Sequence, residues 1–138
     1  MDVNETITKI LKESHSIAVV GLSNSPERPG YRVASYLQSQ GYKIVPVNPT
    51  IAEALGEKSY ANLAAIPGPV DLVDVFRKPE DVPPIVEAAI TKGAKAIWLQ
   101  EGVVNEAAAG RARAAGLLVV MDRCMFKEHS RLHREGRL

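Results

Sequence analysis

Five apolar runs alternate with segments of helical pattern, and this alternation constrains the fold of the chain more than any other feature. The apolar runs cover residues 16–21, 42–49, 70–76, 94–102 and 117–122. The segments between them carry apolar residues at helical spacing or are rich in alanine, and glycines end several of them. Regular alternation of strand and helix is typical of parallel sheets with right-handed crossovers. The sequence therefore predicts an α/β sandwich with five parallel strands, formed as a single domain over residues 1–138.

The first two apolar runs suggest where their strands lie in the sheet. Residues 17–21 (IAVVG) are apolar on both faces, as expected for a strand in the middle of a parallel sheet. We therefore predict the strand order 3-2-1-4-5, with the first strand at the centre. The second run contains Pro46, which has no N–H to donate to a neighbouring strand. We expect the second strand to end or bend at that residue.

Composition and charge exclude several classes of protein. The chain is 46% hydrophobic and 24% charged, with a formal net charge of +1, so it has no general excess of basic residues for nucleic acid or anionic membranes. The first residues do not resemble a signal peptide, and no apolar run approaches the ~20 residues of a membrane-spanning helix. We therefore expect a cytoplasmic protein with neither nucleic acid nor membrane as partner.

The ends of the predicted strands carry positive charge although the chain as a whole is almost neutral. Ligands of open parallel sheets bind beyond the carboxyl ends of the strands, where the strand order reverses. The basic residues that follow strands here are Arg28, Arg32, Arg77, Lys78 and Arg123. A predicted helix that begins near residue 30 adds its free N–H groups at the same edge. An anionic ligand, with phosphate as the first choice, fits this arrangement.

Two common phosphate-binding patterns are missing. The first loop has Gly21 but lacks the other glycines of a dinucleotide fingerprint, and the second strand ends without the carboxylate that grips a ribose. These departures argue against NAD as the ligand. No G-x-x-x-x-G-K-[ST] segment occurs, which excludes a P-loop.

Three separated stretches of the sequence resemble a known family. They are residues 17–49 (IAVVGLSNSPERPGYRVASYLQSQGYKIVPVNP), 70–103 (VDLVDVFRKPEDVPPIVEAAITKGAKAIWLQEGV) and 119–129 (VVMDRCMFKEH). Together they resemble the small single-domain CoA-binding proteins of bacteria and archaea and, more distantly, the N-terminal CoA-binding domain of the succinyl-CoA synthetase α-subunit. The resemblance implies a Rossmann-like three-layer sandwich that binds coenzyme A or an acyl-CoA at the carboxyl edge of the sheet.

The resemblance also implies a set of binding residues. The first loop of the family surrounds the CoA pyrophosphate, and the motifs after the second, third and fourth strands line the rest of the cleft. Here the corresponding residues are Gly21, Ser23, Arg28, Pro29, Gly30, Tyr31 and Arg32 in the first loop, Val47, Asn48 and Pro49 in the second, Phe76 and Arg77 in the third, and Gln100, Glu101 and Gly102 in the fourth. The chain departs from the synthetase in its first loop, which is poor in glycine, and in having no lysine directly after residues 48–49.

The residues offer no evident catalytic machinery, and two alternatives to simple CoA binding stay open. Cys124, the only cysteine, follows the fifth strand at the ligand edge, so an enzyme or redox protein that acts on a CoA thiol or thioester is one alternative. A binding module for another nucleotide is the second. Asp74 is expected to orient a group in the cleft or to cap a neighbour. His129 and His133 lie four residues apart without a third ligand, so we expect no metal site.

Overall fold

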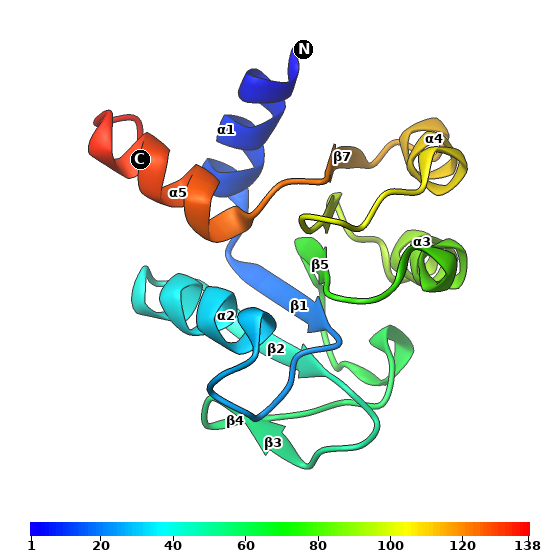
Figure 1. Cartoon of the computed structure of the whole chain (residues 1–138). Coiled ribbons are helices and arrows are strands. Elements are labelled where there is room, and N and C mark those ends of the chain that lie inside the picture. Colours follow the sequence, from blue (N-terminus) through cyan, green and yellow to red (C-terminus); the bar gives the residue numbers. More distant parts are fainter.

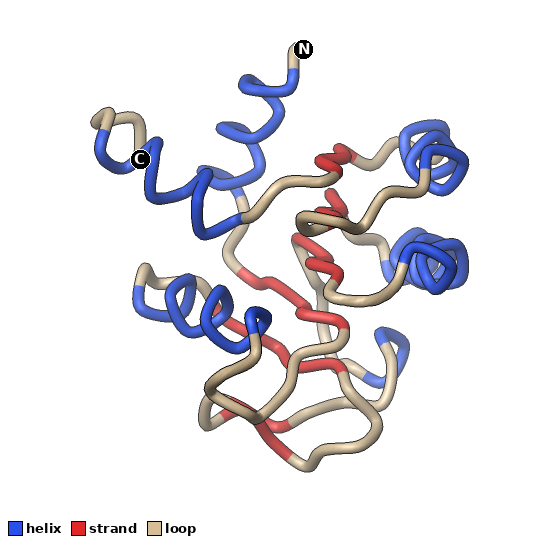
Figure 2. The backbone as a smooth tube through the Cα atoms, viewed as in Figure 1, coloured by secondary structure: helices blue, strands red, loops and turns tan.

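The computed structural model describes all 138 residues, with helices and connecting loops around one central sheet (Figures 1 and 2). The α-helices are α1 (Val3–Glu13), α2 (Pro29–Ser39), α3 (Val82–Lys92), α4 (Glu106–Ala114) and α5 (Met125–Arg134). The strands of the main sheet are β1 (Ser16–Val20), β2 (Lys43–Val47), β5 (Leu72–Val75), β6 (Ala96–Leu99) and β7 (Leu118–Met121). Short elements complete the chain: β3 (Glu53–Ala54), β4 (Glu57–Lys58) and the 3₁₀ turns η1 (Leu63–Ala65) and η2 (Pro79–Asp81).

The prediction of five parallel strands is confirmed, but the predicted strand order is wrong. The main sheet has the order β2-β1-β5-β6-β7, and every neighbouring pair is parallel. In order of appearance along the chain this is 2-1-3-4-5, so the third strand, β5, is central and β1 is its neighbour. Both β1 and β5 are buried on both faces, so apolarity on two faces does not separate a central strand from the one beside it.

We expected the second strand to end or bend at Pro46, and the strand does not end there, because Pro46 lies within β2. β2 is the edge strand of the sheet, and Pro46 stands opposite Val19 in the ladder with β1. An edge strand tolerates proline because one side of its backbone has no ladder partner. The β3–β4 hairpin partly covers this edge, and Tyr60 donates its N–H to the carbonyl of Pro46 over 3.0 Å.

The helices form two layers, one on each face of the sheet (Figure 1). α3 and α4 pack on one face around Val73, Val75 and Ile97, and α1, α2 and α5 pack on the other around Val19, Trp98 and their neighbours. Each face thus has its own buried cluster, as expected for strands that are apolar on both sides. No helix has the length and apolar character needed to cross a membrane.

Candidate functional site

The strand order places its reversal between β1 and β5. After β1 the chain turns through α2 to β2 on one side, and after β5 it turns through α3 to β6 on the other. The two loops touch at this point: a Cβ atom on Gly21 would lie 2.3 Å from the carbonyl oxygen of Phe76 and 2.9 Å from Cδ of Arg77. Parallel sheets of this order bind ligands at the reversal point, so the candidate site begins here.

A cleft of about 1020 Å³ opens at this carboxyl edge, and we refer to it as the main cleft. The structure brings residues from three of the four predicted loops to its walls. The predicted residues that line it are Gly21, Ser23, Arg28, Pro29, Gly30, Phe76, Arg77, Gln100, Glu101 and Gly102. The first, third and fourth strand-end motifs therefore converge as the sequence predicted.

The positive charges in the main cleft differ in whether they form ion pairs within the protein. Arg77 pairs with Asp81 over 3.3 Å within the same loop, and both side chains are about two-fifths exposed. Arg28 and Lys78 also line the cleft, and neither has an ion-pair partner in the protein. Three acidic side chains, of Glu80, Asp81 and Glu101, line the same cleft and balance its three cations. An anionic ligand is therefore favoured locally, near the cations without an ion pair.

The N-terminus of α2 opens into the same cleft. Arg28 is the N-cap residue, but no side chain caps the first-turn N–H groups, and Pro29 begins the helix. Gly30 is buried, and a Cβ atom there would lie 3.2 Å from the ring of Phe76, so a side chain at residue 30 would crowd the ring. Uncapped N–H groups at a helix start bind anions well, because the helix dipole is positive at that end.

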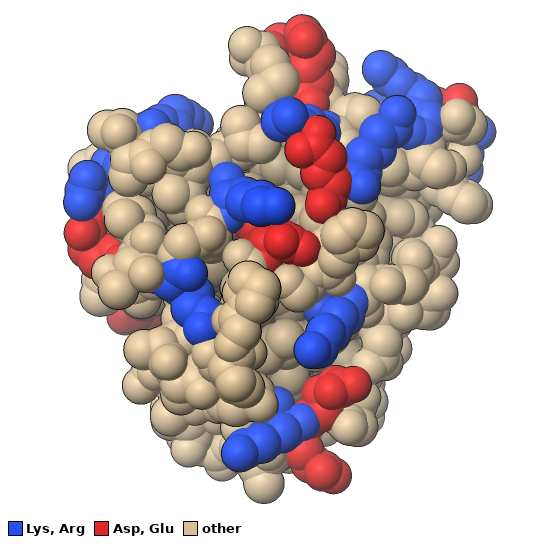
Figure 3. Space-filling view, turned by 180° about the vertical axis from the view of Figure 1, so that it is seen from behind, with Lys and Arg blue, Asp and Glu red and all other residues tan.

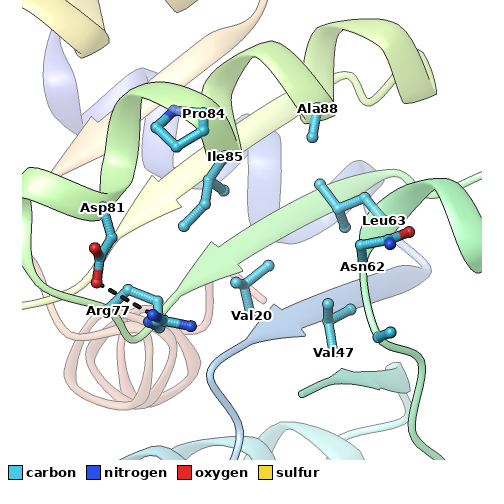
Figure 4. Close-up of a pocket in the computed structure, with 10 residues that line it drawn as sticks. Val20, Val47, Asn62, Leu63, Arg77, Asp81, Pro84, Ile85 and Ala88 are labelled. Carbon is cyan, nitrogen blue, oxygen red and sulfur yellow. Dashed lines mark hydrogen bonds and ion pairs between the residues drawn. The ribbon is translucent and has the colours of Figure 1, made fainter. Parts of the chain in front are cut away.

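A smaller pocket of about 310 Å³ lies beside the main cleft on the α3 face of the sheet (Figure 4). Arg77 and Asp81 line both spaces and form the boundary between them. The other walls of the smaller pocket are mostly apolar and come from the ends of β1 and β2, from residues 61–63 and from α3: Val20, Val47, Ala61, Asn62, Leu63, Pro84, Ile85 and Ala88. We refer to it as the apolar pocket.

Some predicted binding residues lie outside the main cleft. Val47 lines the apolar pocket instead. Asn48 fastens the first loop, because its Nδ2 donates to the carbonyl of Leu22 over 3.0 Å. Pro49 and Arg32 are exposed and line neither space, while Tyr31 packs against the core on the α2 face.

The main cleft also has walls that were absent from the predicted set. They are Val33, Lys78, Pro79, Glu80, Asp81, Val103 and Cys124. Lys78 and Cys124 follow the third and fifth strands, and their positions at strand ends were a usable sequence signal. The contribution of residues 79–81 had no such signal, because it depends on the η2 turn that leads into α3.

The side chain of Gln100, a predicted binding residue, is engaged inside the protein. Its Nε2 donates to Oδ1 of Asp74 over 2.6 Å. Asp74 is completely buried, and this burial raises its pKa to about 7 although the hydrogen bond from Gln100 acts in the opposite direction. Asp74 therefore binds the side chain of a residue that lines the cleft, a contact compatible with the first of the two roles expected for it.

The two histidines on α5, His129 and His133, contact each other and neighbouring side chains within the protein. His129 is buried, its Nδ1 lies 2.8 Å from the hydroxyl of Tyr36, and its ring stacks on His133. Burial, with a smaller effect of His133, lowers the pKa of His129. No group of three or more His, Cys, Asp or Glu side chains converges on a possible metal site.

On the face of the molecule seen in Figure 3, basic side chains are interspersed with acidic ones.

Comparison with known proteins identifies the family. Residues 15–130 match the family model described as CoA binding domain. The chain belongs to this family. The uncharacterized protein YneT of Bacillus subtilis (strain 168) is 44% identical over 124 residues, which cover 90% of this chain and 92% of YneT. A hypothetical protein from Pyrococcus horikoshii OT3 has a similar structure, with a TM-score of 0.92 and 43% identity over 96% of this chain and 93% of that one.

One further relative connects the family to enzymes. The α-subunit of ADP-forming acetate–CoA ligase II from Pyrococcus furiosus is 47% identical over 57 residues. This match covers 41% of the chain and only 12% of that subunit. The chain is therefore related to the CoA-binding part of such ligases, and the relationship does not extend over their other regions.

Proposed function

We propose that this protein binds coenzyme A or an acyl-CoA in the main cleft and the apolar pocket. One observation carries the proposal: a cleft with unpaired cations and an uncapped helix start lies directly beside an apolar pocket, in a member of the CoA-binding domain family. Coenzyme A combines the same features, because it has a charged pyrophosphate and 3′-phosphate joined to an adenine ring and a long pantetheine arm.

The pyrophosphate is assigned to the first loop and the start of α2. There the backbone N–H groups of residues 30 and 31 and the guanidinium of Arg28 supply positive charge. Gly21 keeps the first loop close to β5, and Asn48 holds its backbone from the side. Side chains and a helix end thus replace the glycine-rich loop of dinucleotide-binding proteins.

The adenine ring is assigned to the apolar pocket and the pantetheine arm to the opposite part of the main cleft. The apolar pocket has the volume and apolar walls that suit a planar base, and Asn62 supplies a polar group for its edge. Gln100, Gly102 and Cys124 line the part of the cleft away from the pocket. Arg77 stands between the two spaces, where the 3′-phosphate is expected.

A panel of ligands in a thermal unfolding assay tests the proposal. CoA and acetyl-CoA should raise the melting temperature, whereas NAD, NADP, ATP and FMN should leave it nearly unchanged. A ligand at a hundred times its Kd stabilises the folded state by about 2.7 kcal/mol, which such an assay resolves. A shift with another nucleotide and none with CoA would favour a binding module for that nucleotide.

Filling the apolar pocket tests the assignment of adenine. Ala88→Phe places a ring in the pocket and should weaken CoA binding, while Ala114→Phe, the same substitution at an exposed residue of α4 outside both spaces, should not. Equal affinity of both variants for CoA would reject the adenine assignment.

A second candidate function rests on Cys124. Its side chain lines the main cleft and is partly exposed, so a ligand thiol or thioester can reach it. An enzyme or redox protein that acts on CoA through this cysteine should turn over acyl-CoA, and Cys124→Ala should abolish that turnover. CoA binding without any turnover would leave binding as the function.

A further inference from the structure

A chain of hydrogen bonds runs from the central strand to the last helix beside the main cleft. Gln100 donates through Nε2 to Asp74 Oδ1 over 2.6 Å, and its Oε1 accepts the N–H of Met125 over 3.4 Å. Asp74, Gln100 and Met125 are all buried. Because both ends of the amide are engaged, Gln100 connects β5 to the first turn of α5.

A second buried side chain holds the same segment. Trp98 lies two residues before Gln100, so both side chains point to the same face of the sheet. The indole N–H of Trp98 donates to the carbonyl oxygen of Arg123 over 2.8 Å. Residues 123–125 are thus fixed from two points, and Cys124, which lines the main cleft, stands between them.

Asp74 stands at the origin of this arrangement and is poorly suited to a purely structural role. It is opposite Trp98 in the β5–β6 ladder, and its second carboxyl oxygen, Oδ2, is buried without a hydrogen-bond partner. No cation acts on the pKa of Asp74. That pKa is raised by burial and lowered, to a smaller extent, by the Gln100 amide and the N–H of Val75. An apolar side chain here would avoid the cost of burying a carboxyl group, so stability does not account for an acid at this place.

We propose that Asp74 is a positioning residue for CoA binding: through Gln100 and Met125 it fixes Cys124, the N-cap residue of α5, as part of the cleft wall against which the pantetheine arm lies. The inference rests on the proposed CoA binding and adds a residue that touches no ligand. A wall that is ordered before binding lowers the conformational entropy lost when the ligand arrives. Without an acceptor at residue 74, the Gln100 amide is no longer held in place, and the Met125 N–H loses a fixed partner. The wall then becomes ordered only when the ligand binds, and the conformational entropy lost at that step weakens binding.

Calorimetric titration with two ligands tests this role. CoA has the pantetheine arm proposed to lie against the wall at Cys124, whereas 3′-phosphoadenosine 5′-diphosphate lacks it. Asp74→Leu, which has no acceptor for Gln100, should weaken CoA by about tenfold and leave the truncated nucleotide unchanged. Asp74→Asn keeps an oxygen that accepts from Gln100 and should recover most of the lost affinity. Val73→Ala, a cavity variant on the other face of β5, is the matched control for general loss of stability.

A second variant tests the hydrogen-bond chain from its other end. Gln100→Met breaks the chain from its other end and should reproduce the loss with CoA, which keeps the test valid should Asp74→Leu fold poorly.

Each other outcome overturns the inference. A folded Asp74→Leu that binds CoA as tightly as the wild type leaves CoA binding intact and removes the role of Asp74. Equal weakening of both ligands, or no recovery in Asp74→Asn, also contradicts positioning through the acceptor oxygen. Failure of the wild-type protein to bind CoA overturns both the proposed function and this inference.

Discussion

Gly21 lies directly against the backbone of Phe76, and this contact joins the two loops that form the candidate site. A Cβ atom on Gly21 would stand 2.3 Å from the carbonyl oxygen of Phe76, and the φ angle of Gly21 is +89°. Only glycine combines that backbone conformation with so close an approach. The ends of β1 and β5 can therefore meet where the strand order reverses.

Replacing this glycine should destabilise the protein strongly. Gly21→Ala combines a strained positive φ with a clash against backbone, and we expect a loss of about 2–4 kcal/mol in the free energy of unfolding. Gly110→Ala is the matched control: residue 110 lies within α4 with open space around it, so alanine should stabilise the helix by about 0.5–1 kcal/mol. Urea denaturation measures both values. A Gly21→Ala variant as stable as the wild type would contradict the contact.

The sequence predicted the layers of the fold correctly but not the order of the strands. Alternating strand and helix patterns depend on local periodicity, which the chain displays clearly. Strand order depends on the side to which each crossover turns, and the apolar runs of β1 and β5 are too similar to decide it. Pro46 was the usable signal, because a proline inside a strand indicates an edge, and β2 is at the edge.

The candidate site was predictable where it consists of strand ends and unpredictable where it depends on packing. The first, third and fourth loops converge because parallel strands end at one edge. The hydrogen bond from the Gln100 amide to Asp74 could not be predicted, because it depends on the register of β5 and β6 and on the position of α5. The hydrogen bond by which Asn48 holds the first loop could not be predicted either, because it depends on the path of that loop around Leu22.

Asp74 should make stability fall with rising pH over a defined range. Burial raises its pKa from 3.8 to about 7. Between these values the unfolded chain loses the proton and the folded protein keeps it, so folding is progressively disfavoured, and above pH 7 the deficit is constant. Asp74→Asn does not titrate, so its stability relative to the wild type should rise from pH 4 to pH 8 by a few kcal/mol, at most about 4. Urea denaturation at several pH values measures this difference.

Asp71 provides a control of opposite sign. Burial alone would raise its pKa, but the backbone N–H groups of His15 and Ser16 bind the carboxylate and lower it overall. The stabilisation is present above the unfolded pKa and disappears as the pH falls through the folded value. Asp71→Asn should therefore cost more at pH 7 than at pH 3. The same pH trend in both variants would show that Asp74 is not a buried neutral acid.

Two arginines at the cleft should respond differently to the phosphates of the ligand. Arg28→Ala should weaken CoA and dephospho-CoA alike by about tenfold, because Arg28 lies at the proposed pyrophosphate position. Arg77→Ala should weaken CoA while hardly affecting dephospho-CoA, because Arg77 stands at the proposed 3′-phosphate position. Arg113, exposed in the last turn of α4 and without an ion pair, is the control. Calorimetric titration measures each affinity, and an equal effect of Arg77→Ala on both ligands would place Arg77 on the adenine instead.

Cys124 should form a mixed disulfide with the ligand under oxidising conditions. The thiol lines the main cleft, so a bound CoA disulfide can exchange with it, releasing one CoA thiol as the protein–CoA bond forms. Intact mass after incubation with oxidised CoA should increase by one CoA, and Cys124→Ser should show no increase. An unmodified wild-type protein that nevertheless binds CoA would mean that the pantetheine arm ends away from Cys124.

Calorimetric titration of the wild-type protein with CoA measures the proposed binding itself. We predict saturable binding of one CoA per chain, much weaker binding in Arg28→Ala, and competition by acetyl-CoA but not by NAD. A wild-type protein that remains folded and shows no binding at millimolar CoA would mean that this protein is not a CoA-binding protein.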